Sequence, residues 1–272
     1  MLNSPYLASL FSLEDKIVLI TGAAGGIGST LAQGLAGAGA VLALADLSEQ
    51  PILDLIESLG EKQEADHAHA AFVLNVRDLA SIDQCVRAVL DRFGRIDVLI
   101  NCAGINQREG YLDVAEETYD RLMGVNLKGV FFLTQAVVRE SMMKTGGKII
   151  NVASFTSTQA MGGNSVYGAT KSGIAALTRS MAIEWAKFNI QANAIAPGHI
   201  LTQLTQVTWA NEHRAAYLRE RIAAERPGLP EELIGITILL SSPASSYITG
   251  QLINIDGGAL AGGKPWQFDT KY

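Results

Sequence analysis

The chain has 272 residues, of which 48% are hydrophobic and 18% charged, and its net charge is −6. This is the composition of an ordinary globular protein, and an acidic chain without a basic block argues against a nucleic-acid partner. The two cysteines, Cys85 and Cys102, are too few and too far apart for a disulfide scaffold or a zinc site. No apolar run reaches the roughly 20 residues that span a bilayer, and no signal peptide is visible. We therefore expect a cytoplasmic protein with no membrane partner and no metal.

The N-terminal part of the chain predicts a phosphate site. After an expected irregular lead-in over residues 1–15, the apolar run Ile17–Ile20 predicts a buried strand. The strand leads into a glycine-rich turn, Thr21–Gly28, and then a helical pattern through Ala38. Free N–H groups and the helix dipole at such a helix start attract phosphate, and glycines let the backbone approach it. The stretch therefore predicts a site for a dinucleotide pyrophosphate.

The second strand, over residues 41–45, ends at an acidic residue, Asp46. A carboxylate at this position can accept hydrogen bonds from the adenosine ribose hydroxyls and would repel a 2′-phosphate. No Arg or Lys occurs in the glycine-rich turn or directly after Asp46. The pattern favours NAD over NADP.

The rest of the chain continues to alternate between helices and strands. We expect helices over residues 49–59, 79–93 and about 115–144, a helix that bears Tyr167 and Lys171, and strands over 70–74, 96–100, 148–153 and 190–196. This alternation predicts an α/β fold: a single-domain, Rossmann-type doubly wound parallel sheet over residues 1–272, with helices on both faces. Ligands bind at the carboxyl ends of such strands. The residues expected at these ends are Asp46, Asn75, Asn101, Ser154 and Pro197.

Tyr167 and Lys171 lie four residues apart, so they share one face of their predicted helix. An ammonium group one turn away favours the phenolate, and we expect it to lower the tyrosine pKa from its usual value of about 10. Ser154, at the end of the preceding strand, is placed to hold the same substrate oxygen. The three residues suit proton transfer coupled to hydride transfer at a carbonyl or a secondary alcohol.

Six motifs in order resemble those of the short-chain dehydrogenase/reductase family, over about Leu13 to Gly258. They are Thr21–Gly28 (TGxxxGxG), Asn101–Gly104 (NNAG), Ser154 upstream of the next motif, Tyr167 to Lys171 (YxxxK), Pro197-Gly198 with Thr202 (PGxxxT), and Asp256–Gly258 after the closing strand. Two positions depart from the family pattern, since Asn75 stands where Asp is frequent and Cys102 where Asn is usual.

The resemblance implies a role for each matching residue. Tyr167 would be the general acid/base, Lys171 would lower its pKa and bind the nicotinamide ribose, Ser154 would orient the substrate oxygen, and Asn126 would support a proton-relaying water chain. The residues implied for binding of the cofactor NAD are Gly22, Gly26, Ile27, Gly28, Asp46, Asn75, Val76, Asn101, Ala103, Gly104, Tyr167, Lys171, Pro197, Gly198, Ile200 and Thr202.

A narrower resemblance concerns the substrate. Phe11–Leu13, residues 148–154, 184–190 and 193–198 look like members of the gluconate 5-dehydrogenase and 2-deoxygluconate dehydrogenase type, which act on sugar acids and polyols. Hydrogen-bonding candidates for such a substrate are Ser154, Arg108, Gln159, Asn164 and His199. Arg108 is either the partner of a carboxylate or a solvated surface residue.

Two further segments are assigned by resemblance. Residues 202–226 would be a flap over the substrate. In the tail, residues 259–272, Trp266 and Phe268 would pack on a neighbouring subunit of a homotetramer.

Other functions stay open. The same chemistry fits a 3-oxoacyl thioester or a small hydrophobic secondary alcohol or ketone, although Asp46 argues against an NADPH-preferring acyl reductase. A non-catalytic NAD-binding scaffold on the same fold is an alternative of another class.

Overall fold

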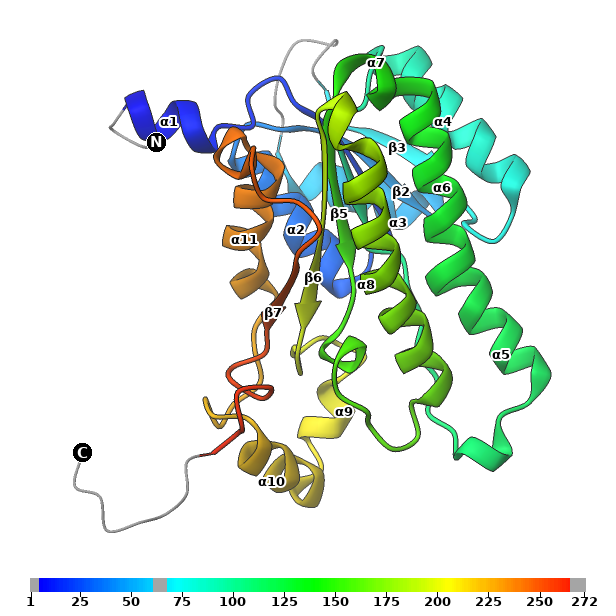
Figure 1. Cartoon of the computed structure of the whole chain (residues 1–272), viewed down its shortest axis with the longest axis vertical. Helices are drawn as coiled ribbons and strands as arrows, with labels where there is room; N and C mark the ends of the chain where they lie inside the picture. Colours follow the sequence, from blue (N-terminus) through cyan, green and yellow to red (C-terminus); the bar gives the residue numbers. More distant parts are fainter. Residues whose placement is uncertain (1–4, 61–67, 265–272) are drawn as a thin grey trace.

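A computed structural model describes residues 5–60 and 68–264. Its centre is a seven-stranded sheet in the order β3-β2-β1-β4-β5-β6-β7, in which every pairing is parallel (Figure 1). The strands are β1 (Ile17–Thr21), β2 (Val41–Asp46), β3 (Ala70–Val73), β4 (Val98–Asn101), β5 (Gly147–Val152), β6 (Ile190–Pro197) and β7 (Leu252–Ile255). The predicted doubly wound parallel sheet is confirmed.

Successive residues of the central strands point to opposite faces, and each face has its own hydrophobic core. Val18 and Ile20 of β1 pack on one face with helices α2 (Gly26–Gly37), α3 (Glu49–Ser58) and α11 (Ile234–Ser241). Leu19 packs on the other face with α4 (Leu79–Phe93), α6 (Val130–Val137) and α8 (Ser165–Trp185). Because both faces are covered, the central strands consist of nearly continuous apolar residues.

The predicted helix over residues 115–144 is one continuous helical run with two wider turns. It comprises α5 (Glu116–Met123), a π-helical segment η3 (Gly124–Gly129), α6, a second π segment η4 (Val138–Met142) and α7 (Met143–Thr145). A π turn changes which side chains face the sheet, and functional residues are frequent at such turns. Here η3 carries Asn126.

The expectation of an irregular lead-in over residues 1–15 is wrong for residues 5–11, which form the helix α1 (Pro5–Phe11). Proline at the first helical position presets the backbone for a helix. The helix has no buried residue and stands at the surface (Figure 1), so the chain pattern carries no amphipathic signal for it.

Short helices complete the fold. After β6 the chain forms α9 (Gln206–Trp209) and α10 (Glu212–Arg221), the segment predicted as a flap. The remaining short 3-10 helices are η2 (Tyr111–Asp113), η5 (Phe155–Ser157), η6 (Ala186–Phe188), η7 (Pro230–Leu233) and η8 (Pro243–Ser245). Trp266 and Phe268 lie outside the described residues.

The sheet order reverses between β1 and β4, since the chain moves outward from β1 to β3 and then returns to β4 on the other side. Loops leave neighbouring strands in opposite directions at such a point and open a crevice at the carboxyl edge of the sheet. Among the residues that the structure describes, no helix is long and apolar enough to cross a membrane, and no three His, Cys, Asp or Glu side chains are grouped to hold a metal ion.

Candidate active site

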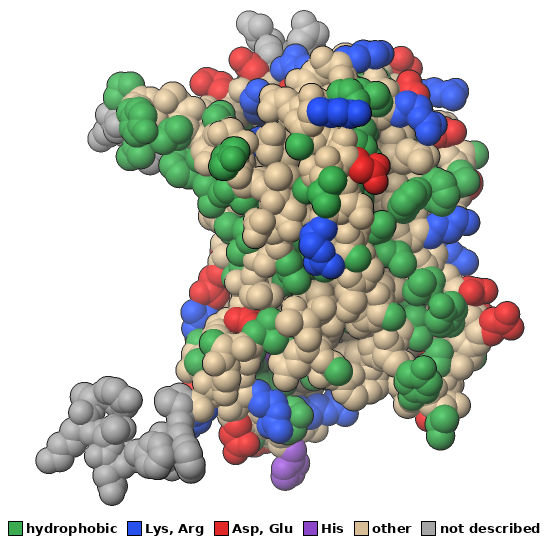
Figure 2. Space-filling model, in the orientation of Figure 1, with side chains coloured by type: hydrophobic (Ala, Val, Ile, Leu, Met, Phe, Trp, Pro, Cys, Tyr) green, Lys and Arg blue, Asp and Glu red, His purple; other side chains and the backbone are tan. Residues whose placement is uncertain are grey.

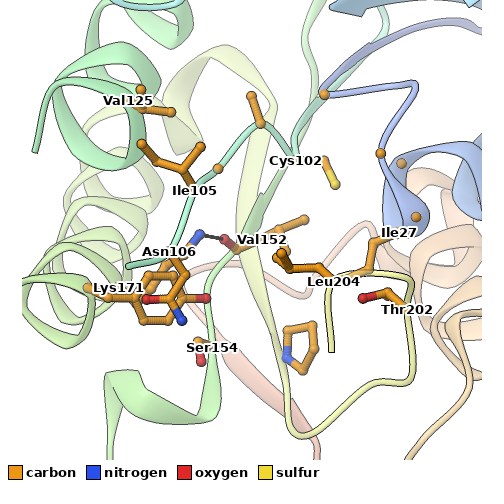
Figure 3. Close-up of a pocket in the computed structure, with 18 of the residues that line it drawn as sticks. Ile27, Cys102, Ile105, Asn106, Val125, Val152, Ser154, Lys171, Thr202 and Leu204 are labelled. Carbon is orange, nitrogen blue, oxygen red and sulfur yellow. Dashed lines mark hydrogen bonds between the residues drawn. The ribbon is translucent and has the colours of Figure 1, made fainter. Parts of the chain in front are cut away.

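A cleft of about 760 Å³ lies at the carboxyl edge of the sheet, beside the reversal between β1 and β4. Figure 3 shows Ser154 and Lys171 on one side of the cleft and Ile27 and Thr202 on the other. Loops after the strands β1, β2, β4, β5 and β6 all contribute to its lining. The cleft therefore lies where the sequence predicted ligand binding.

The glycine-rich turn fits a dinucleotide pyrophosphate. Gly22 has a φ of +65°, and a Cβ there would lie 2.7 Å from Ala103 Cα. A Cβ on Gly28 would lie 2.1 Å from the Gly22 carbonyl oxygen, so only glycine lets α2 start this close to the turn. No side chain caps the N-terminus of α2, and Gly25, Gly26, Ile27 and Gly28 line the cleft. This backbone offers N–H groups and the positive end of the helix dipole to an anion.

Asp46, at the end of β2, is fixed above this turn. Its Oδ2 accepts a hydrogen bond from Ala24 N at 2.9 Å, and its Oδ1 accepts one from Leu47 N at 2.7 Å. Asp46 lines the cleft together with Asn75 and Val76, which follow β3. Each carboxylate oxygen has a second lone pair for a ribose hydroxyl.

The loop after β4 is held from both sides. Thr21 Oγ1 accepts hydrogen bonds from the N–H groups of Cys102 (3.2 Å) and Ala103 (3.1 Å). Asn126, fully buried, accepts from Ile105 N at 2.9 Å and donates to Ile105 O at 2.8 Å. A Cβ on Gly104 would lie 3.4 Å from Asn126 Oδ1 and 3.5 Å from Lys171 Nζ, so both side chains close on this glycine.

Ser154, Tyr167 and Lys171 meet in the cleft. The 3-10 turn η5 carries Ser154 at its N-cap, where the hydroxyl accepts from Thr156 N at 3.1 Å. Lys171 is one turn after Tyr167 on α8, and its Nζ lies 5.7 Å from the Tyr167 ring centre. The ammonium also donates to Val152 O at 2.7 Å (Figure 3). Ser157 Oγ donates to Lys171 O at 2.7 Å and ties η5 to α8.

The electrostatics of these groups differ from the prediction. Burial raises the pKa of Tyr167, and its hydrogen bond with Ser154 lowers it by less. Burial also lowers the pKa of Lys171 to about 8. The expected lowering of the Tyr167 pKa is therefore wrong for the protein groups alone, because desolvation of the phenolate outweighs the hydrogen bond with Ser154.

The outer part of the cleft is lined by Arg108, Asn164 and His199. The side chain of Asn164 is buried, with 5% of the residue exposed, and its Oδ1 has no hydrogen-bond partner among the described residues. Burial, and then the charge of Arg108, lower the pKa of His199 to about 4, so this imidazole is neutral at pH 7. Its ring packs 5.0 Å from that of Phe155, centre to centre. This end offers one exposed cation and two neutral polar groups.

A family model described as enoyl-(acyl carrier protein) reductase matches residues 22–259. The chain is also 42% identical to the 2-dehydro-3-deoxy-D-gluconate 5-dehydrogenase of Escherichia coli over 263 residues, which cover 94% of this chain and 99% of that relative. The chain belongs to the short-chain dehydrogenase/reductase family. This confirms the resemblance, and the protein is an oxidoreductase whose cleft suits a nicotinamide cofactor.

Two other relatives differ in the substrate for which they are named. The 3-oxoacyl-(acyl-carrier-protein) reductase of Thermotoga maritima is 40% identical over 249 residues, which cover 91% of this chain and 99% of that relative. A solved structure of a gluconate 5-dehydrogenase from Burkholderia cenocepacia, in complex with NADP and tartrate, superposes with a TM-score of 0.88 at 36% identity, covering 94% of this chain and 99% of that one.

Most residues predicted for this family member line the cleft. They are Gly22, Gly26, Ile27, Gly28, Asp46, Asn75, Val76, Ala103, Gly104, Arg108, Ser154, Asn164, Tyr167, Lys171, Pro197, Gly198, His199, Ile200 and Thr202. Asn126 lies behind the lining and acts on it through Ile105.

Besides Asn126, two predicted residues do not line the cleft. Asn101 is the last residue of β4, and its side chain turns into the core, where it donates to Thr134 Oγ1 at 2.9 Å and Asn151 Oδ1 at 2.8 Å. Gln159 is exposed outside the cleft, beyond η5. Both corrections follow from side-chain direction, which the position of a residue after a strand does not determine.

Sequence reasoning missed several lining residues. Arg77 and Arg121 bring two further cations to the cleft, and Asn106, Met161 and Leu204 complete parts of its wall. Arg77 follows Asn75 by two residues, so the end of β3 was a signal for it. Arg121 comes from the middle of a helix, where an arginine normally reads as solvated surface.

Proposed function

We propose that this protein is an NAD-dependent dehydrogenase that oxidises a secondary hydroxyl group of a sugar acid or polyol. The observation that carries the proposal is the meeting of Ser154, Tyr167 and Lys171 beside the glycine-rich turn, with Arg108 at the outer end of the same cleft. The relatives named above as gluconate-type dehydrogenases support the substrate class.

In the proposed reaction Tyr167 takes the proton of the hydroxyl group, and Ser154 holds the same oxygen by a hydrogen bond. Lys171, Ile200 and Thr202 line the cleft and would hold the nicotinamide end of the cofactor, which would supply the acceptor for the hydride, so that a secondary alcohol and NAD would give a ketone, NADH and a proton. Because burial raises the tyrosine pKa, the phenolate needs a nearby positive charge, and Lys171 supplies one.

Lys171 also suits onward transfer of the proton. Its pKa of about 8 lies near neutrality, so it can exchange protons with water at working pH. In the relay that we propose, Asn126 contributes by fixing the loop around Gly104, which both side chains approach. Its own amide is occupied by the backbone of Ile105.

The choice of NAD rests on Asp46. A 2′-phosphate would approach a carboxylate whose two oxygens are held in place by Ala24 N and Leu47 N. Arg77, which also lines the cleft, is a cation that would offset this repulsion if it reached the 2′-phosphate. The Burkholderia cenocepacia relative was solved with NADP, so kcat/KM must be compared with both cofactors.

For the substrate, we assign the carboxylate to Arg108 and the hydroxyl groups to Asn164 and His199. The buried Asn164 Oδ1 has no partner among the described residues and can accept from a hydroxyl group. Neutral His199 can both donate and accept. Residues 202–226 would cover this end as a flap, because Thr202, Leu204 and Thr205 already line the cleft.

The proposal is tested by following NADH formation at mildly alkaline pH, with NAD and NADP in parallel. The panel spans gluconate-type acids, hexitols and pentitols, simple secondary alcohols and a 3-hydroxyacyl thioester. Turnover of a sugar acid or polyol with NAD supports the proposal. Turnover confined to the thioester would favour the alternative that the Thermotoga maritima relative represents.

We further propose a cytoplasmic homotetramer. Exposed apolar side chains over α5 and α6 support self-association; Tyr119 is 47% and Phe131 42% exposed, and hydrophobic groups gather on this side in Figure 2. Cys85 and Cys102 are free thiols, which suits a reducing compartment. Light scattering coupled to size-exclusion chromatography measures the number of subunits.

A further inference from the structure

In the loop between β4 and η2, side chains that face the cleft alternate with side chains that face helix α5. Residues 102–110 have no regular secondary structure, and from Ala103 to Gly110 half-buried residues alternate with exposed ones. Asn106 and Arg108 line the cleft. Their neighbours Gln107 and Glu109 turn toward α5 instead. The position of Arg108 is therefore set by contacts that its two neighbours make.

Those contacts form one connected network. The Gln107 side-chain oxygen accepts a hydrogen bond from Arg121 Nη2 on α5, and the Gln107 side-chain nitrogen donates to Glu109 Oε1. Thr118, also on α5, donates to the same Glu109 oxygen at 3.3 Å. The neutral amide of Gln107 thus bridges the cation of Arg121 and the anion of Glu109. The loop is joined to α5 at Gln107, through Arg121, and at Glu109, through Thr118.

Backbone contacts hold the same loop at both ends. Glu109 N donates to Gly163 O at 3.0 Å, directly before Asn164 of the proposed substrate site. At the other end, Asn126 makes its two hydrogen bonds with Ile105. Between these points, within residues 5–60 and 68–264, the side chains that anchor the loop by hydrogen bonds are Gln107 and Glu109. Arg108 itself has no hydrogen bond or ion pair within the described part of the chain.

We propose that Gln107 and Glu109 are positioning residues, which fix the loop so that Arg108 meets the carboxylate of a sugar acid. This inference rests on the proposed function, because it requires that Arg108 binds that carboxylate. An arginine whose loop is fixed loses less conformational freedom when it binds, and the gain appears as substrate affinity. Gln107 and Glu109 do not touch the reacting carbon, so kcat should change little.

The test compares Gln107→Met with the wild type, with Arg108→Ala and with the double variant. Methionine keeps the length of the side chain and removes its hydrogen bonds. With a gluconate-type acid, Gln107→Met should raise KM about fivefold, the factor for one lost hydrogen bond, while kcat and the Kd for NADH stay within about twofold. In the Arg108→Ala background the same change should have no further effect on KM. Gln50→Ala is the matched control, since Gln50 makes one surface hydrogen bond, to Asp54 at 2.8 Å.

Each of the other outcomes would contradict either the proposed function, the contact between Arg108 and the carboxylate, or the positioning role of Gln107. If the wild type does not oxidise any sugar acid, the proposed function fails. If it does and Arg108→Ala leaves KM unchanged, the carboxylate contact is wrong, and the positioning role falls with it. If Gln107→Met raises KM equally in both backgrounds, or lowers kcat instead, Gln107 does not act through Arg108. Should Gln107→Met not fold, Glu109→Gln, which keeps the volume and removes the charge, is measured in the same four-way comparison with the same expected direction.

Discussion

Replacement of Lys171 by methionine should inactivate the enzyme and yet stabilise it at neutral pH. Lys171 is only 5% exposed, and burial lowers its pKa from 10.5 to about 8. At 1.36 kcal/mol for each tenfold change in proton affinity, keeping the lysine charged in the fold costs about 3 kcal/mol. Methionine avoids this cost and loses the hydrogen bond to Val152 O, which contributes about 1.5 to 3 kcal/mol because its donor is charged. The expected net gain is about 0 to 1.5 kcal/mol at pH 7.

The pH dependence separates this explanation from a simple packing effect. Below pH 8 both the folded and the unfolded chain carry the proton on Lys171, and the full cost applies. Between pH 8 and 10.5 only the unfolded chain binds the proton, so the stability of the wild type rises with pH. From pH 7 to pH 10 the wild type should regain about 2 to 3 kcal/mol relative to the variant.

Urea unfolding at pH 7 and pH 10 measures this difference. Groups that titrate in both proteins, such as Lys148 with its pKa of about 8, cancel when the variant is compared with the wild type at each pH. Lys144→Met, at an exposed position, controls for the change in residue type. If Lys171→Met loses more than about 2 kcal/mol at both pH values, the ammonium stabilises the fold, and the reasoning from burial is refuted.

Three further predictions concern the cleft. Tyr167→Phe should lower kcat by about 10²- to 10⁴-fold, the usual contribution of a general acid/base, and leave the fluorescence-measured Kd for NADH within about twofold. Asp46→Ser should raise the ratio of kcat/KM with NADP to that with NAD, because the carboxylate beside the ribose is removed. Gly28→Ala should lower the Tm and weaken cofactor binding, because its Cβ would lie 2.1 Å from a backbone oxygen, whereas Gly37→Ala in the same helix meets nothing within 4 Å and should stabilise by about 0.5 to 1 kcal/mol.

Each of these has an outcome that contradicts it. Turnover that survives in Tyr167→Phe would require another proton acceptor. An unchanged cofactor ratio in Asp46→Ser would mean that Asp46 does not select NAD; Asp54→Ser, on the exposed side of α3, is its control. Equal Tm values for the two glycine variants would show that the start of α2 has room for a side chain.

The fold was largely predictable because each segment carries its own signal. The bounds of α4 agree residue for residue with the prediction: Asp78 caps its start through Ala80 N, and Gly94, with a φ of +76°, ends it. The buried strands read as apolar runs because helices cover both faces of a parallel sheet. The surface helix α1 buries no residue, so its sequence has no hydrophobic periodicity from which a helix could be predicted.

The site was predictable where a motif fixes both residue and direction, and failed where direction depends on packing. Tyr167 and Lys171 share a helix face, so their meeting followed from spacing alone. Asn101 belongs to β4 itself, so strand alternation turns it toward Thr134 rather than the cleft. Arg121 reaches the cleft only because α5 packs beside the loop after β4. The raised pKa of Tyr167 depends on its burial, which no spacing shows.

The most direct test of the account is to follow a label through one turnover. The enzyme is incubated with NAD and a gluconate-type acid deuterated at its carbon-bound positions, and the NADH is analysed by NMR. The account predicts one deuterium at C4 of the nicotinamide ring for each ketone formed, with none in Tyr167→Phe beyond its residual rate. NADH without deuterium, or no NADH from any sugar acid or polyol, would contradict direct hydride transfer from the proposed class of substrate.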